Sequence, residues 1–230
     1  MYIRIKKQIP NLFTLGNLSC GVMAILCIFK DELQPAVLWV LLAAVLDFFD
    51  GFLARLLKVS GELGKQLDSL ADMVTFGVAP GCMLYALSSD IDGYVRYVFL
   101  LLPVFSAYRL AKFNIDTRQS TSFIGVPTPV TGIMCMSWGY IDESFREYIF
   151  VNPWSFALFC VVVSLLLVSE LKLPSLKLKK GPLSSYTKHI VLLLIGLIAL
   201  VFSGWLCIPV FYLAYVLSSF SHLFGKSAHH

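Results

Sequence analysis

Four aspartates lie close together in a chain that is otherwise mostly apolar: Asp47, Asp50, Asp68 and Asp72. The first two are three residues apart and the last two are four apart. If the flanking segments are helices, each pair therefore projects from one helix face. A polar turn near residues 58–61 would fold the second helix back onto the first. The sequence thus predicts that all four carboxylates converge on one point.

Close carboxylates repel one another in a medium of low dielectric constant, and divalent cations relieve that repulsion. Oxygen ligands alone favour Mg²⁺, Mn²⁺ or Ca²⁺ over zinc, and pairs of such ions recur in phosphoryl transfer. We therefore expect a site for two metal ions on the four aspartates. Gly51 would allow close approach of the backbone, and Arg55 offers a planar fork suited to phosphate. The alternative is a structural network in which the acids pair with Arg55, Lys58 and Lys65.

The composition is that of a membrane protein. Of the 230 residues, 58% are hydrophobic and only 14% are charged, with a mean hydropathy of +0.79. Such a chain predicts an all-α, polytopic bundle of transmembrane helices rather than a soluble domain. We expect one domain over residues 1–230, with a catalytic core at about 10–170 and an additional C-terminal helix pair at about 188–222. The net charge of +4 is modest and indicates no nucleic-acid partner.

About eight spans are expected from the apolar runs: 12–29, 35–57, 63–87, 95–111, 130–140, 154–168, 190–202 and 206–220. The fifth could continue toward residue 150. Residues 2–9 mix basic and bulky apolar residues, which predicts a short interfacial segment that Pro10 interrupts. Pro80 should kink the third span and free carbonyl groups that could line a cavity. The last two spans contain few polar groups, so we expect them to serve as scaffold.

The distribution of basic residues predicts the orientation. With eight spans, all the lysines and arginines except Lys30, Arg96 and Arg146 fall on one side. The positive-inside rule makes that side cytoplasmic. Both termini and the aspartates lie on the same side. The six cysteines are scattered and include no C-x-x-C pair, so we expect them to be reduced core residues.

The aspartates belong to a longer pattern, D-x2-D-G-x2-A-R-x8-G-x3-D-x3-D, which residues 47–72 match at every fixed position. This pattern resembles the signature of the CDP-alcohol phosphatidyltransferase family, integral membrane enzymes of phospholipid synthesis. The resemblance implies metal-dependent chemistry with Asp72 as the base and Asp68 beside it. It also implies a homodimer, and contacts to CDP-diacylglycerol from four motif residues: Gly51, Ala54, Arg55 and Gly64.

Other stretches resemble bacterial phosphatidylserine synthases, a branch of this family. They are residues 10–21, 75–80, 109–114 and 123–129. Residues 109–114 read R-L-A-K-F-N, with Lys112 where the branch has a second arginine, and this loses a bidentate fork. The resemblance places Asn17 beside the nucleotide, with Thr14 as a lesser candidate. Arg109, Lys112 and Asn114 are our candidates for binding the acceptor.

The implied reaction transfers a phosphatidyl group from CDP-diacylglycerol to the hydroxyl of L-serine, giving phosphatidylserine and CMP. It would take place among membrane lipids, in the bacterial cytoplasmic (inner) membrane. Two alternatives stay open. One is the same chemistry with another acceptor, such as glycerol 3-phosphate or inositol phosphate. The other is a cation transporter, because intramembrane carboxylates alone permit that role.

Overall fold

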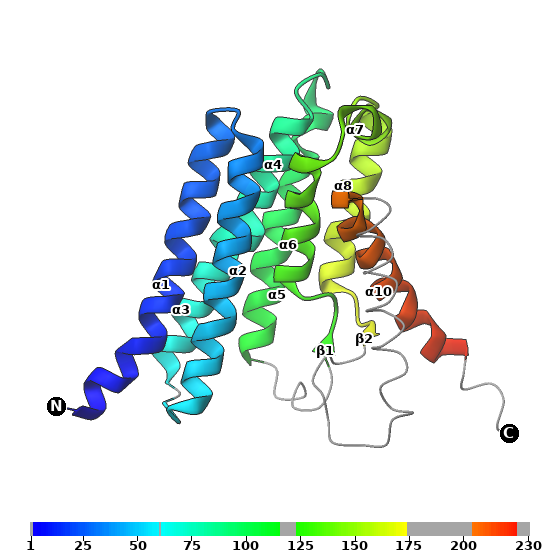
Figure 1. Ribbon diagram of the computed structural model, residues 1–230. Coiled ribbons are helices and arrows are strands. Elements are labelled where there is room, and N and C mark those ends of the chain that lie inside the picture. Colours follow the sequence, from blue (N-terminus) through cyan, green and yellow to red (C-terminus); the bar gives the residue numbers. More distant parts are fainter. Residues whose placement is uncertain (1, 60, 116–122, 174–203, 225–230) are drawn as a thin grey trace, which may run out of the picture.

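The computed structural model describes residues 2–59, 61–115, 123–173 and 204–224, which form a bundle of antiparallel helices (Figure 1). The helices are α1 (Tyr2–Phe29), α2 (Leu33–Leu56), α3 (Glu62–Asp72), α4 (Ala79–Leu87), α5 (Leu101–Ile115), α6 (Thr128–Ser137), α7 (Glu143–Phe150), α8 (Pro153–Val168) and α10 (Cys207–Phe224). A π-helix, η1 (Met73–Val78), joins α3 to α4, and three short 3-10 helices are η2 (Tyr94–Leu100), η4 (Trp138–Tyr140) and η6 (Gly204–Leu206).

Four helical stretches are long and apolar enough to cross a membrane: Gln8–Phe29, Leu33–Leu56, Glu62–Leu87 and Tyr94–Ile115. They confirm the first four expected helices. The sixth and eighth are present as the shorter apolar helices Pro153–Val168 and Gly204–Leu217. The fifth is the ten-residue α6, and the seventh, 190–202, lies outside the described residues. The protein is therefore an integral membrane helix bundle.

The expected break at Pro10 is wrong, because α1 runs without interruption from Tyr2 to Phe29 with this proline inside it. A proline inside a helix removes one hydrogen bond and bends the axis. Figure 1 shows the first turns of α1 at an angle to the rest. The basic segment at residues 2–9 is therefore a continuation of the first long helix.

The third span departs from regular α-helix just before Pro80, as predicted. The irregularity is a π-helix rather than a simple kink. The amide of Ala79 donates to the carbonyl of Val74, five residues back. Proline has no N–H to give to the Phe76 carbonyl, and a widened turn accommodates this loss. A Cβ at Gly132 would lie 2.7 Å from that carbonyl oxygen. The freed carbonyl therefore faces the backbone of α6, and not a cavity as we expected.

The fifth predicted span, which begins with α6, ends well before residue 150. After α6 and η4 the chain extends at Ile141, and Asp142 caps a separate helix, α7, by accepting the Ser144 amide at 3.0 Å. A side-chain cap of this kind satisfies an amide at the start of a helix that otherwise has no partner. The fifth span therefore does not continue toward residue 150.

A pair of two-residue strands is the one exception to an all-helical fold in the part of the chain that the structure describes. Strand β1 (Phe123–Ile124) pairs with β2 (Lys172–Leu173) in antiparallel register. Gly125 follows with a φ of +77°, and its amide donates to the Leu171 carbonyl at 3.1 Å. Glycine adopts positive φ without strain. The loop before α6 is thus fixed to the end of α8, at the same end of the bundle as the turn from α2 to α3 (Figure 1).

Candidate active site

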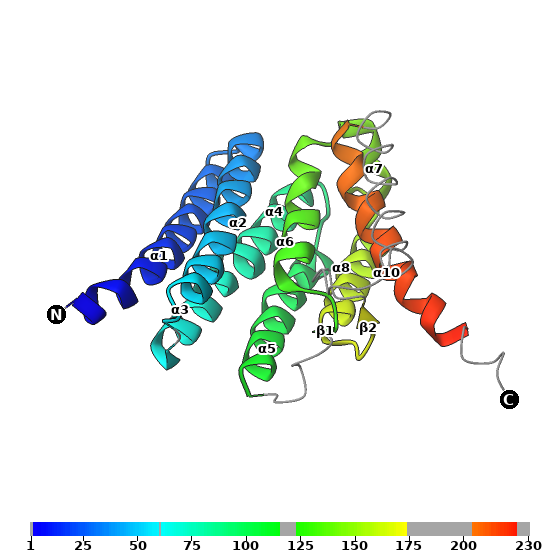
Figure 2. The same cartoon turned by 60° about the horizontal axis from the view of Figure 1, so that its bottom comes forward.

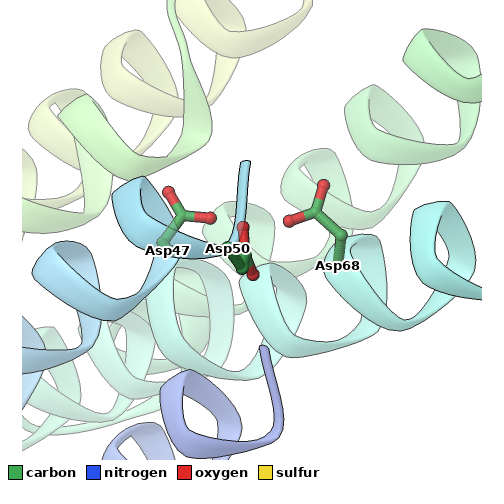
Figure 3. A group of neighbouring side chains, drawn as sticks. All are labelled: Asp47, Asp50 and Asp68. Carbon is green, nitrogen blue, oxygen red and sulfur yellow. The ribbon is translucent and has the colours of Figure 1, made fainter. Parts of the chain in front are cut away.

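The aspartates come together as the sequence predicts (Figure 3). Asp47 and Asp50 lie near the end of α2, and Asp68 faces them from α3. One carboxylate oxygen from each of these three lies within 4.8 Å of the others. The carboxyl group of Asp72, the last residue of α3, lies beside that of Asp47. The four acids therefore form one cluster between α2 and α3.

The turn between α2 and α3 produces this convergence. Lys58 adopts a positive φ of 53°, and the Val59 amide donates back to the Ala54 carbonyl at 3.0 Å. A residue in the left-handed region commonly ends a helix in this way. The chain then reverses, so that α3 runs back along α2 and carries Asp68 toward Asp47.

Helix α1 supplies two polar partners to the cluster from inside the bundle. Thr14 Oγ1 donates to Asp50 Oδ2 at 2.6 Å, and Asn17 Nδ2 donates to Asp72 Oδ1 at 3.3 Å. Both α1 side chains are buried. The other amide atom, Asn17 Oδ1, has no hydrogen-bond partner within the described residues. A buried polar atom without a partner is uncommon and indicates a missing ligand, ion or water.

No lysine or arginine forms an ion pair with the cluster within the described residues. None of the four carboxylates has a lysine or arginine nitrogen within 4.0 Å, and the ion pair found there, Lys112 with Glu170, lies elsewhere. The structural-network alternative required Arg55, Lys58 or Lys65 to pair with the acids, so this finding counts against it. Oxygen ligands gathered without a cation are a donor set suited to a hard divalent metal. The residues present therefore fit a metal site.

The residues predicted to contact the nucleotide have different roles in the structure. The Arg55 guanidinium is exposed and lies over Gly51, because a Cβ built there would be 3.6 Å from Arg55 Nη1. Ala54 is half-buried beside them. Gly64 instead lets α1 approach α3, since its Cβ would lie 3.2 Å from Asn11 Oδ1. Gly51 and Arg55 thus leave an open surface next to the acids, whereas Gly64 serves helix packing.

The three predicted acceptor contacts do not share one pocket. The Arg109 side chain is buried, and its Nη1 donates to Thr128 Oγ1 at 2.8 Å. Lys112 Nζ points away to Glu170 Oε1, 3.9 Å distant. Asn114 Nδ2 donates to Ser69 Oγ at 2.8 Å, which ties α5 to α3. Of the three, Arg109 is the one buried inside the bundle.

Sequence reasoning missed several residues around Arg109. Thr128 accepts from its guanidinium, and Tyr215 on α10 lies near it. Thr128 lies inside the segment 123–129, but the sequence did not mark it as a site residue. A signal for Tyr215 did exist: Tyr212 and Tyr215 place two phenols three residues apart in an apolar helix, and buried phenols normally need polar partners.

Comparison with known proteins decides the family. The family model described as CDP-alcohol phosphatidyltransferase matches residues 7–220. This chain belongs to the CDP-alcohol phosphatidyltransferase family. The predicted resemblance is therefore confirmed over most of the chain, and the cation-transporter alternative is set aside for this CDP-alcohol phosphatidyltransferase.

Curated relatives of this CDP-alcohol phosphatidyltransferase carry a more specific name. A CDP-diacylglycerol–serine O-phosphatidyltransferase from Bacillus subtilis is 36% identical over 172 residues, covering 74% of this chain and 92% of the relative. One of the same name from Helicobacter pylori is 32% identical over 187 residues, covering 80% and 79%. A third, from Mycobacterium leprae, is 29% identical over 217 residues, covering 90% and 72%.

Proposed function

We propose that this enzyme transfers the phosphatidyl group of CDP-diacylglycerol to the hydroxyl of L-serine, releasing CMP. The observation that carries the proposal is a cluster of four carboxylates, in the family's motif, that makes no ion pair in the described residues. The names of the relatives support serine as the acceptor. The segments 109–114 and 123–129 support the same choice over glycerol 3-phosphate or inositol phosphate.

The aspartates at positions 47, 50, 68 and 72 would hold divalent metal, Mg²⁺ or Mn²⁺, as two ions, and Ca²⁺ could take the same place. Bound metal would offset negative charge on the diphosphate and stabilise the charge that develops during transfer. Asp47 and Asp68 are half-buried while Asp50 and Asp72 are buried. This gradient leaves one side of the cluster open to a substrate.

The nucleotide side of the site would be formed by α1 and the end of α2. Arg55, exposed beside Gly51, offers a guanidinium fork to phosphate oxygens. The small side chain of Ala54 would keep this region open, and Gly64 would support it by letting α1 pack closely against α3. Asn17 is buried beside Asp72, and its Oδ1 has no partner in the described residues. That acceptor would suit an amino or hydroxyl group of the nucleotide.

In the chemical step, the serine hydroxyl oxygen bonds to the phosphorus that carries diacylglycerol. The bond from that phosphorus to the bridging oxygen breaks, and its electron pair leaves with CMP. Asp72 takes the proton of the hydroxyl, and Asp68 lies close by on the same helix face. Asn17 Nδ2 donates to Asp72 Oδ1, which orients the carboxylate for this transfer. Positioning of the hydroxyl next to phosphorus would contribute more than the basicity of Asp72.

The acceptor side would centre on Arg109. A guanidinium binds a carboxylate through two parallel hydrogen bonds, and Arg109 Nε has no partner in the described residues. Free serine brings such a carboxylate. Lys112 would add positive charge on the last turn of α5, where it forms an ion pair with Glu170. Asn114 would bind the acceptor from the place where α5 meets α3, where it donates to Ser69.

The membrane arrangement we propose has eight spans, with the site facing the cytoplasm and residues 2–9 in the interface. The acids lie at the end of the bundle that carries Arg55 and Lys58, while Lys30 lies in the α1–α2 turn and Arg146 in α7, both at the opposite end (Figure 1). This asymmetry supports the positive-inside prediction for a bacterial inner membrane. The many exposed apolar side chains of α1 and α2 fit contact with lipid tails or with a second subunit of a homodimer.

A panel of acceptors tests the proposal. CMP release from CDP-diacylglycerol would be measured in detergent with Mn²⁺ and with L-serine, glycerol 3-phosphate, inositol phosphate or no acceptor. We expect release with serine alone. Release with a different acceptor would preserve the catalytic cluster and contradict our assignment of the acceptor side.

A further inference from the structure

Helix α10 contributes two buried phenols to a hydrophobic core of the bundle. Tyr212 and Tyr215 are three residues apart, so they share one helix face, and they are only 3% and 2% exposed. This helix packs against α6 on the side of the bundle away from α1 and α2 (Figure 2). The hydroxyl groups of Tyr212 and Thr131 are 3.4 Å apart. The C-terminal helix therefore makes polar contact with α6 inside an apolar core.

The same face of α6 leads to Arg109. Thr128 precedes Thr131 by one helical turn, and its hydroxyl accepts from Arg109 Nη1 at 2.8 Å. The Arg109 side chain is 9% exposed, and its Nε is without a partner in the described part of the chain. A guanidinium has five N–H groups, so one threonine cannot satisfy it. Further acceptors must come from the protein or from a ligand.

Two groups from different helices lie near this guanidinium. Asp72 of the acid cluster is one, although the two make no ion pair within 4.0 Å in the described residues. The phenol of Tyr215 is the other. Helix α10 runs antiparallel to α6 (Figure 1), so Tyr215, one turn beyond Tyr212, comes level with Thr128, which binds Arg109. Arg109 therefore lies near both the acid cluster and helix α10. A phenol oxygen can accept from a guanidinium N–H, and such a bond strengthens when water is excluded.

We propose that Tyr215 is a positioning residue for acceptor selection. Together with Thr128 it fixes the plane of the Arg109 guanidinium, so that the free N–H groups face the acid cluster and bind the carboxylate of the acceptor amino acid. This inference rests on the proposed function, because it needs an acceptor with a carboxylate. It gives the C-terminal helix, which the sequence indicated as scaffold, a part in choosing the substrate.

The test compares two tyrosine variants of the full-length protein. Tyr215→Phe removes only the hydroxyl near Arg109. Tyr212→Phe is the matched control, since it removes a hydroxyl from the same face of the same helix, at equal burial, that contacts Thr131 instead. Initial rates of CMP release would give the KM for L-serine, the KM for CDP-diacylglycerol and kcat, and thermal unfolding in the same detergent would compare stability.

For Tyr215→Phe we expect the KM for L-serine to rise roughly tenfold, while kcat and the KM for CDP-diacylglycerol stay within about twofold. Tyr212→Phe should leave all three constants unchanged. Tyr215→His keeps a ring acceptor and should recover part of the serine affinity. An unchanged KM for serine in Tyr215→Phe, or an equal effect of Tyr212→Phe, would overturn the inference.

A different result would contradict the proposed function itself. If the unmodified protein releases no CMP in response to serine, serine is not the acceptor, whatever the variants do. If serine-dependent release is normal but Tyr215→Phe raises the KM for CDP-diacylglycerol as much as that for serine, the function stands. The role of Tyr215 in acceptor selection is then wrong.

Discussion

Replacement of Thr14 by valine tests how the acid cluster is held. Its hydroxyl donates to Asp50 Oδ2 at 2.6 Å, which is short, as expected for a bond to a charged acceptor. The same hydroxyl lies 3.2 Å from the Pro10 carbonyl. One proton serves one acceptor best, so the shorter contact dominates. Valine keeps the shape of the side chain and removes only this donor.

The size of the effect follows from the contact. A hydrogen bond to a charged group contributes about 1.5–3 kcal/mol, and loss of a group that orients a metal ligand typically lowers metal affinity about 10- to 100-fold. Asp50 is buried, with 6% of its surface exposed, so water cannot easily replace the threonine. We therefore expect the Mn²⁺ concentration for half-maximal CMP release to rise by a factor in that range.

The assay is a Mn²⁺ titration of CMP release, with direct Mn²⁺ binding by electron paramagnetic resonance as a second readout. Thr14→Ser keeps the donor and should resemble the unmodified protein. Ser19→Ala is the control on the same helix, because Ser19 is exposed and its hydroxyl donates to the Leu15 carbonyl instead. An unchanged Mn²⁺ dependence in Thr14→Val would refute the view that this hydroxyl orients a metal ligand.

Three further predictions follow from other contacts. Gly132→Ala would place a Cβ 2.7 Å from the Phe76 carbonyl, so we expect a loss of about 1–3 kcal/mol in thermal unfolding, whereas Gly61→Ala, with nothing within 4 Å, should be neutral. An undiminished unfolding midpoint in Gly132→Ala would contradict the direct packing of α6 on the π-helix. Lys112→Gln removes an exposed pair with Glu170 at 3.9 Å, so its effect on stability should stay below about 1 kcal/mol; a larger loss would mean that the pair is structural. Treatment with EDTA should abolish turnover, and Mn²⁺ or Mg²⁺ should restore it; chelator-resistant turnover would argue against a metal site.

Helix periodicity made the acid cluster predictable. The spacing of Asp47 and Asp50, and of Asp68 and Asp72, defines one face on each helix. The polar turn between them leaves little freedom in how the helices meet. The contacts of Thr14 and Asn17 are harder to foresee, because they depend on the relative register of α1 against α2 and α3. These contacts join side chains that are 36 positions apart in the sequence in one case and 55 positions apart in the other.

The features that sequence reasoning missed depend on tertiary packing. Pro80 signals an irregularity, but only the close approach of Gly132 shows that the freed carbonyl faces α6. Strands of two residues have no periodicity to read. The spacing of Tyr212 and Tyr215 signals a polar contact within an apolar run, but the sequence does not show which residue each phenol faces, and Arg109 is found near Tyr215 only in the folded chain.

The most direct test of the account replaces the carboxylates that carry the chemistry. CMP release with CDP-diacylglycerol, L-serine and Mn²⁺ would be compared for Asp68→Asn, Asp72→Asn and the control Asp92→Asn, whose side chain is exposed in a loop outside the cluster. Asparagine keeps the shape of aspartate and removes its charge. We expect both cluster variants to fold and to lose turnover, and the control to remain active. Normal CMP release by either cluster variant would contradict the assignment of these acids to the reaction.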